Sequence, residues 1–143
     1  MILDIPKDYS DVTGLRNCNI SENSGEDFYH TKLNEVFAES LKKKEKLTLI
    51  MDGTLDGYSP SFVDEMIGNL VYDFSLSVVK ENLIVISQTD ARWPIMLSNK
   101  TYPEWEKRRK NKQQPRITQR HRPWFRLQNG SLVKDEWIEY QKK

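Results

Sequence analysis

The sequence predicts a compact α/β domain with parallel strands. Two short apolar runs, residues 46–51 (KLTLIM) and 82–87 (NLIVIS), are bounded by turn-forming residues and are typical of buried strands. Between them, residues 60–74 repeat apolar side chains at a period of 3.6, which predicts a helix with Ser59 as its N-cap and Pro60 at its first position. A strand, a crossover helix and a strand form a βαβ unit, so we expect parallel strands and a right-handed connection.

The remaining elements are predicted from local signals. A short strand is expected at the N-terminus, and a long helix is expected from Ser24 to the lysines at 42–44, which suit the negative end of a helix dipole. Residues 92–114 are expected to form a broken helix with Pro103 in the first turn of its second half. Asn129-Gly130 predicts a β-hairpin, followed by one or two turns of amphipathic helix.

Composition limits the class of protein. The 143 residues suit one domain with a short extension, and the single cysteine, Cys18, provides no disulfide framework. No apolar run approaches the roughly twenty residues of a membrane span, and the N-terminus has no signal-peptide pattern. We therefore expect a cytoplasmic chain without membrane association. His30 and His121 are isolated in the sequence, so we expect no metal site, and no dinucleotide or P-loop motif indicates a cofactor.

The stretch IMDGTLDGYSPSF, residues 50–62, resembles the aspartyl-phosphate loop of haloacid-dehalogenase-type phosphatases, Asp-x-Asp-Gly-Thr. Asp52, Gly53 and Thr54 match its last three residues. The nucleophile position is Ile50, which has no carboxylate to attack phosphorus. The sequence therefore predicts no catalytic residue and no enzyme activity, and phosphatase activity is the third hypothesis for this chain.

The succession SGEDFY, LTLIMDG and GYSPSFVDEMIGNLV, with Gly68 in the last segment, resembles the STAS-like domains of uncharacterised function found in bacteria and their mobile elements. These domains are relatives of the anti-sigma-factor antagonists. The resemblance covers roughly residues 8–100. It implies a mixed sheet with helices packed mainly on one side and a regulatory, non-enzymatic role in protein interaction. We therefore divide the chain into a STAS-like α/β domain, 1–104, and an extension, 105–143, with the basic segment and the hairpin.

The resemblance also implies a region for a partner or a switch. In the antagonists, a Ser or Thr at the start of the helix after the central strand is phosphorylated by a histidine-kinase-like ATPase, and this modification breaks their complex. Here Ser-Pro-Ser-Phe stands in place of their Asp-Ser-Ser-Gly. The predicted partner-binding or switch residues are Asp52, Asp56, Tyr58, Ser59, Ser61, Asp64 and Glu65. The alternative is structural: Ser59 is an ordinary N-cap, and Asp52 and Asp56 form turns beside glycines.

Charge is segregated along the chain. Residues 1–106 hold ten basic against eighteen acidic residues, whereas residues 107–126, the basic strip, hold nine basic residues and no acid. Cations among aromatic side chains suit a nucleic-acid backbone and unpaired bases. The candidate residues for this second hypothesis are Trp105, Arg108, Arg109, Lys112, Arg116, Arg120, Arg122, Trp124 and Arg126. In the alternatives, the strip is a solvated helix face with a flexible connector, or it docks on the acidic body of the same chain or of a second copy.

The expected partner is a protein, either a histidine-kinase-like ATPase or another regulatory protein. Nucleic acid is the alternative partner, and a homodimer is left open by the opposite charges of body and strip. No cofactor and no membrane contact are expected.

Overall fold

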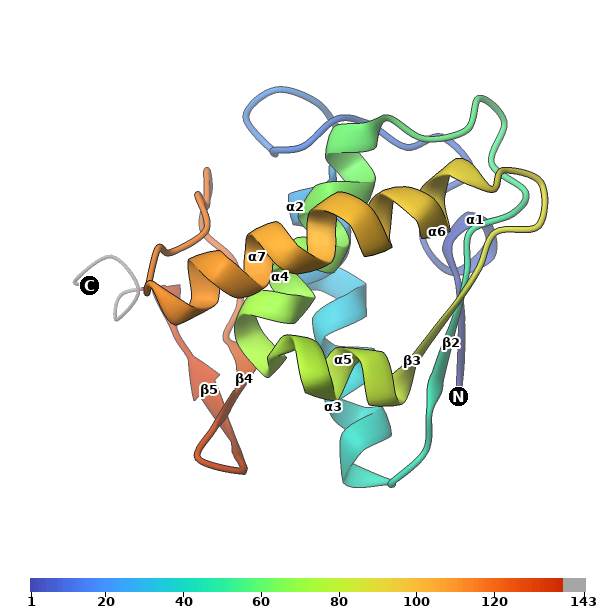
Figure 1. Cartoon of the computed structure of the whole chain (residues 1–143). Coiled ribbons are helices and arrows are strands. Elements are labelled where there is room, and N and C mark those ends of the chain that lie inside the picture. Colours follow the sequence, from blue (N-terminus) through green and yellow to red (C-terminus); the bar gives the residue numbers. More distant parts are fainter. Residues whose placement is uncertain (138–143) are drawn as a thin grey trace.

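The computed structural model describes residues 1–137 (Figure 1). Strands β1 (Ile2–Asp4), β2 (Leu47–Ile50) and β3 (Leu83–Ile86) form a sheet in the order β1-β2-β3. Both pairings are parallel, with Ile2 opposite Thr48 and Leu47 opposite Leu83. The predicted pair of parallel strands joined by a helical crossover is therefore confirmed.

The expected mixed sheet is wrong for the described part of the chain. The three strands are all parallel because helical segments connect each strand to the next, and the antiparallel pair forms a sheet of its own. That pair, β4 (Trp124–Gln128) and β5 (Ser131–Asp135), is joined by Asn129 and Gly130, whose φ angles of 53° and 79° fit a two-residue hairpin turn. Figure 1 shows this hairpin on the opposite side of the molecule from the parallel sheet.

Helix α4 (Pro60–Phe74) lies at the centre of the fold, and twelve of its fifteen residues are buried. The Ser59 side chain accepts a hydrogen bond from the Phe62 N–H, and Pro60 occupies a position where no N–H is needed, as the sequence predicts. Helix α5 (Leu76–Asn82) follows directly and was not predicted. Ser75 separates the two helices with a φ of 80°.

The helix expected from Ser24 is present in three parts: α2 (Gly25–Phe28), a π-helical turn η1 (Tyr29–Leu33) and α3 (Asn34–Lys42). The Ser24 hydroxyl accepts from the Asp27 N–H and caps the segment. A short helix, α1 (Ile5–Asp8), follows β1. Helix α2 and η1 contact α4, and α3 contacts β2, so this segment connects the central helix to the sheet.

Helices α6 (Arg92–Met96) and α7 (Tyr102–Lys110) are joined by a second π-helical turn, η2 (Leu97–Thr101). The break expected before Pro103 is this turn, since proline has no N–H for the regular helical hydrogen bond. Helix α7 packs against α4. The proposed boundary after residue 104 falls inside α7, and the division into a domain and an extension stays a prediction.

One face of the parallel sheet faces the core. Leu3, Leu47 and Leu49 are buried there, whereas Ile2 and Ile84, on the opposite face, are 68% and 42% exposed. No described helix is long and apolar enough to cross a membrane. The helix expected after the hairpin lies mostly outside the described residues.

Candidate interaction site

The loop between β2 and α4 is tied to the neighbouring βα loop by Asp52. The Asp52 carboxylate accepts hydrogen bonds from the N–H groups of Gln88 (3.0 Å) and Thr89 (2.8 Å) and from the Thr89 hydroxyl (2.7 Å). These backbone hydrogen bonds lower the pKa of Asp52 below its ordinary value. Both carboxylate oxygens are thus engaged at the carboxyl ends of β2 and β3, which gives Asp52 a structural function.

The same loop is held on its other side by the N-terminal segment. The Leu55 N–H donates to the Asp11 carbonyl (2.8 Å), and the Thr13 hydroxyl donates to the Gly57 carbonyl (3.2 Å). The Tyr58 hydroxyl donates to the Met51 carbonyl (2.6 Å), which closes the loop on itself. Leu55 and Asp56 project from this framework, and Leu55 is 70% exposed. The loop therefore presents an apolar side chain beside a carboxylate on a backbone that is fixed from two directions.

The two serines of the predicted switch differ in their contacts. The Ser59 hydroxyl accepts from the Phe62 N–H and donates to the Gly14 carbonyl (3.1 Å), so it caps the helix and fastens the N-terminal segment. The Ser61 hydroxyl lies 3.2 Å from that of Ser59 and is partly exposed. Of the two, Ser61 is the one whose hydroxyl does not cap the helix.

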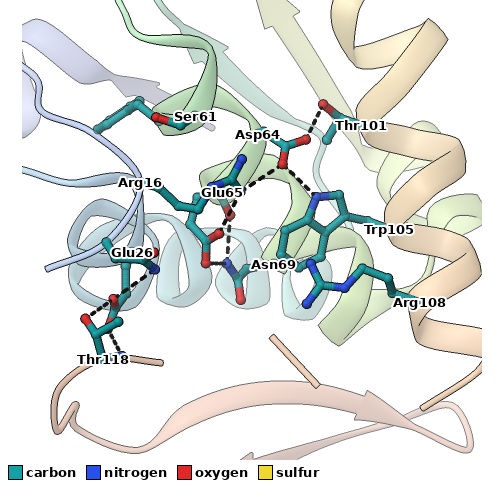
Figure 2. A network of polar contacts seen from close by, with 12 residues as sticks. Arg16, Glu26, Ser61, Asp64, Glu65, Asn69, Thr101, Trp105, Arg108 and Thr118 are labelled. Carbon is teal, nitrogen blue, oxygen red and sulfur yellow. Dashed lines mark hydrogen bonds and ion pairs between the residues drawn. The ribbon is translucent and has the colours of Figure 1, made fainter. Parts of the chain in front are cut away.

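Asp64 and Glu65 point into the molecule, which the sequence did not predict (Figure 2). Asp64 accepts hydrogen bonds from the Thr101 hydroxyl (2.9 Å) and the Trp105 indole N–H (3.1 Å). Arg16 pairs with both carboxylates, at 2.9 Å from Asp64 and 3.0 Å from Glu65. This network, which we call the Arg16 network, connects the N-terminal segment through α4 to α7.

Glu65 is the more buried of these two carboxylates. Its side chain is 4% exposed, and burial raises its pKa although Arg16 and the Asn69 amide (2.7 Å) oppose the shift. A buried carboxylate needs such partners, because an unpaired charge in the interior is costly. Asp64 and Glu65 therefore stabilise the packing of the N-terminal segment and α7 against α4, and they are not available as surface contacts.

Comparison with known proteins gives one match. Residues 24–92 match a family model described as a STAS-like domain of unknown function (DUF4325). The match covers 69 of the 143 residues of the chain. The resemblance inferred from the sequence is confirmed over a range that runs from the Ser24 cap through β2, the β2–α4 loop and α4 to β3. No curated protein and no solved structure matches the chain.

The basic strip lies outside the matched range of the STAS-like domain and docks on it. Arg122 pairs with Glu35 (2.6 Å), and Arg126 pairs with the buried Asp73 (3.2 Å). Burial raises the pKa of Asp73 to about 6, and the positive charge of Arg126 opposes that shift. Of the alternatives left open by the sequence, docking on the acidic body of the same chain is the arrangement of Arg122 and Arg126.

The two tryptophans proposed for base stacking are core residues. Trp105 and Trp124 are each 2% exposed, and the Arg108 guanidinium lies over the Trp105 ring at 4.1 Å. Arg109 is paired with Glu106 on the same helix. The exposed cations of the strip are Lys107, Lys110, Lys112, Arg116, Arg120 and Arg122, and the last of these is already paired.

A buried carboxylate that sequence reasoning missed fastens the strip to the STAS-like domain. Glu26 is fully buried and accepts from the Thr118 N–H (3.0 Å), the Thr118 hydroxyl (2.6 Å) and the Cys18 N–H (3.1 Å), and His121 lies 2.7 Å from it. Burial alone would raise its pKa, but the hydrogen bonds from His121 and Thr118 lower the pKa of Glu26 to about 2. Helical spacing marked Glu26 only as an acid in a first turn, and no local pattern identifies partners 92 and 95 residues away.

Proposed function

We propose that this chain is a non-enzymatic protein-interaction module that docks a regulatory protein on its β2–α4 loop. The observation that supports this most directly is Leu55, which is 70% exposed on a loop whose backbone is fixed by Asp11 and, through Asp52, by Thr89. An exposed apolar side chain on a rigid support loses little conformational entropy on binding, as an interface anchor requires. The docking face comprises Val12, Leu55, Asp56 and the start of α4.

The absence of catalysis is part of the proposal. Ile50 stands where the aspartyl-phosphate loop has its nucleophile, and the Asp52 carboxylate is occupied by two backbone N–H groups. Because these hydrogen bonds hold the loop in one conformation, the loop is suited to present a binding surface. The matched family is described as STAS-like, and the resemblance implies a histidine-kinase-like ATPase or another regulatory protein as the partner.

Ser61 is the residue through which phosphorylation would regulate docking. Asp64 and Glu65 follow it by three and four residues on α4, so the three side chains lie on neighbouring turns of one helix face. A phosphate at Ser61 adds nearly two negative charges and competes for Arg16 with both carboxylates. Loss of Arg16 from its network would free the N-terminal segment that supports the loop at Asp11 and Thr13. Phosphorylation would therefore weaken partner binding.

The test is affinity capture by the full-length chain from a lysate of its native cells, with two variants beside it. Leu55→Ser removes the exposed anchor, and Ile20→Ser removes a comparably exposed side chain (60%) from the N-terminal segment, outside the docking face. We expect a discrete protein to be retained by the wild type and by Ile20→Ser and to be reduced at least about tenfold with Leu55→Ser. Equal retention by all three chains would refute the docking face.

Ser61→Asp tests the switch separately. It should weaken capture of the same partner while the circular dichroism spectrum stays that of the folded chain, whereas Ser61→Ala should bind like the wild type. Unchanged capture with Ser61→Asp would remove regulation at this position and leave the docking face intact.

Nucleic-acid binding is retained as a second candidate on one observation. Lys107, Lys110, Lys112, Arg116 and Arg120 are exposed on the end of α7 and the segment that follows it. Binding through these side chains would be electrostatic, and affinity would fall steeply with salt because each neutralised phosphate releases counterions. A fluorescent single-stranded oligonucleotide that shows no binding at low salt would exclude it.

A further inference from the structure

Three side chains with metal-ligating atoms meet where the basic strip docks on the STAS-like domain. The Cys18 thiol, the Glu26 carboxylate and the His121 imidazole place one ligand atom each within 4.8 Å of the other two. They come from the N-terminal segment, from α2 and from the strip, so only the folded chain assembles them. Glu26 and His121 are buried, and Cys18 is partly exposed.

We propose that Cys18, Glu26 and His121 form a binding site for a divalent cation of borderline softness, and that Zn²⁺ is the ion that fits it best. A thiolate, an imidazole and a carboxylate are together the ligand types that Zn²⁺ prefers, whereas Mg²⁺ and Ca²⁺ select oxygen ligands alone. With bonds of about 2.0–2.3 Å, tetrahedral zinc separates its ligand atoms by roughly 3.5 Å. The three atoms therefore need to move by less than the length of one bond.

A second observation points to the same place. His30 is 3% exposed, and neither of its ring nitrogens has a hydrogen-bond partner among residues 1–137. Its ring stacks on the His121 ring with centroids 4.1 Å apart. A buried imidazole with both nitrogens unsatisfied is costly, and such groups need a water molecule or an ion to complete their contacts. A cation with three protein ligands keeps a position for water, and in the proposed site such a water would supply the partner that His30 lacks.

The approach to Cys18 suits a cation. A pocket of about 310 Å³ opens beside the thiol and is lined by Cys18, Ser21, Glu22, Asn23, Asp27 and Gln119. Two of these six side chains are acidic and none is basic, so the local field attracts positive ions. On binding, the thiol releases its proton to solvent and the sulfur bonds the metal as a thiolate, while His121 gives up its Nε2 hydrogen bond to Glu26 and binds through Nε2 as neutral imidazole with its proton on Nδ1.

Such a site would hold three segments of the chain together. Glu26 already accepts hydrogen bonds from Thr118, and the cation would add a bond from Cys18 and one from His121 around the same carboxylate. The N-terminal segment, α2 and the basic strip would then be joined at one ion. Metal binding would stabilise the docked strip, independently of whether the β2–α4 loop binds a partner.

The experiment is a titration of the chelator-treated, full-length chain with Zn²⁺ and, as a spectroscopic probe, with Co²⁺. Because Cys18 is the only cysteine, a thiolate-to-cobalt charge-transfer band reports this residue alone. We expect one equivalent of Zn²⁺ to bind, the cobalt band to appear, and the melting temperature to rise by roughly 10 °C at a Zn²⁺ concentration of about 100 Kd.

Three variants make the test specific. Cys18→Ser should abolish the cobalt band and weaken Zn²⁺ binding more than about 100-fold, and His121→Asn should weaken it comparably. Glu104→Gln removes an exposed acid on α7 and should leave both titrations unchanged. Absence of the band in the wild type, or equal Zn²⁺ affinity in Cys18→Ser, would overturn the proposal. If His121→Asn fails to fold, the cobalt band of the wild type and the Zn²⁺ affinity of Cys18→Ser still test the proposal.

Discussion

Replacing Gly68 with alanine should destabilise this chain, although alanine is the better helix former. Gly68 lies in the middle of α4, and a methyl group added there would meet the Trp105 ring, with its Cε2 and Nε1 atoms at 2.0 and 2.3 Å. Such contacts are far inside van der Waals separation, so Trp105 would have to move. The absence of a side chain at residue 68 is what lets α7 approach α4.

The size of this destabilisation follows from the packing and the hydrogen bond that Trp105 would lose. Its side chain is 2% exposed and its indole N–H donates to Asp64 (3.1 Å). Overpacking of a core costs about 1–3 kcal/mol, and loss of a hydrogen bond to a charged group costs about 1.5–3 kcal/mol. The higher helix propensity of alanine offsets about 1 kcal/mol of this destabilisation. We therefore expect the free energy of unfolding to fall by about 1.5–5 kcal/mol.

Urea unfolding followed by tryptophan fluorescence and by circular dichroism measures this change. A double-mutant cycle with Trp105→Ala isolates the cause, because in that background Gly68→Ala should be neutral or slightly stabilising. A Gly68→Ala chain as stable as the wild type, or a loss that persists without Trp105, would refute the packing argument.

Three further changes test the buried polar groups by urea unfolding. Arg16→Met should lower the free energy of unfolding by about 3 kcal/mol, because it leaves two buried carboxylates without their cation. Arg92→Met removes one member of an exposed ion pair and should leave the free energy of unfolding unchanged. Equal effects of the two substitutions would contradict a stabilising role of the Arg16 network. Burial lowers the pKa of His30 to about 3, so unfolding is favoured as pH falls from about 6.5 towards 3. His30→Phe should remove that acid sensitivity and raise the free energy of unfolding at pH 7 by about 1–2 kcal/mol. An unchanged dependence of the free energy of unfolding on pH would contradict this prediction. The pKa of Glu26 is about 2 in the folded chain against an ordinary 4.5, so its stabilisation is present above pH 4.5 and lost towards pH 2. Glu26→Gln should be less stable at pH 7 and lose less stability over that window, and a variant as acid-sensitive as the wild type would count against this assignment.

The parts of the fold that the sequence predicts well are those with local causes. The Ser59 cap, Pro60 and the apolar period define α4 without reference to the rest of the chain. Asn129-Gly130 likewise determines its hairpin, because both residues adopt the positive φ that the turn requires. The mixed sheet was inferred from the resemblance, and the purely parallel sheet differs from it.

The site was harder to predict because its contacts are between distant residues. Asp64 and Glu65 resemble a solvated pair at the start of a helix, and nothing near them indicates that Arg16, 48 and 49 residues away, covers them. The basic strip was similarly ambiguous, because a run of cations is compatible with nucleic acid and with acids of the same chain. Its partners Glu26 and Asp73 lie on different helices, and only the packed structure identifies them.

Site-specific photo-crosslinking in the native cells tests the docking face most directly. A photoreactive amino acid would be placed at Leu55 in one chain and at Ile20 in another, since both side chains are exposed and neither is needed for the core. We predict a discrete adduct with one protein from position 55 and none of the same mass from position 20. No adduct at position 55, or the same adduct from both positions, would contradict a partner site on the β2–α4 loop.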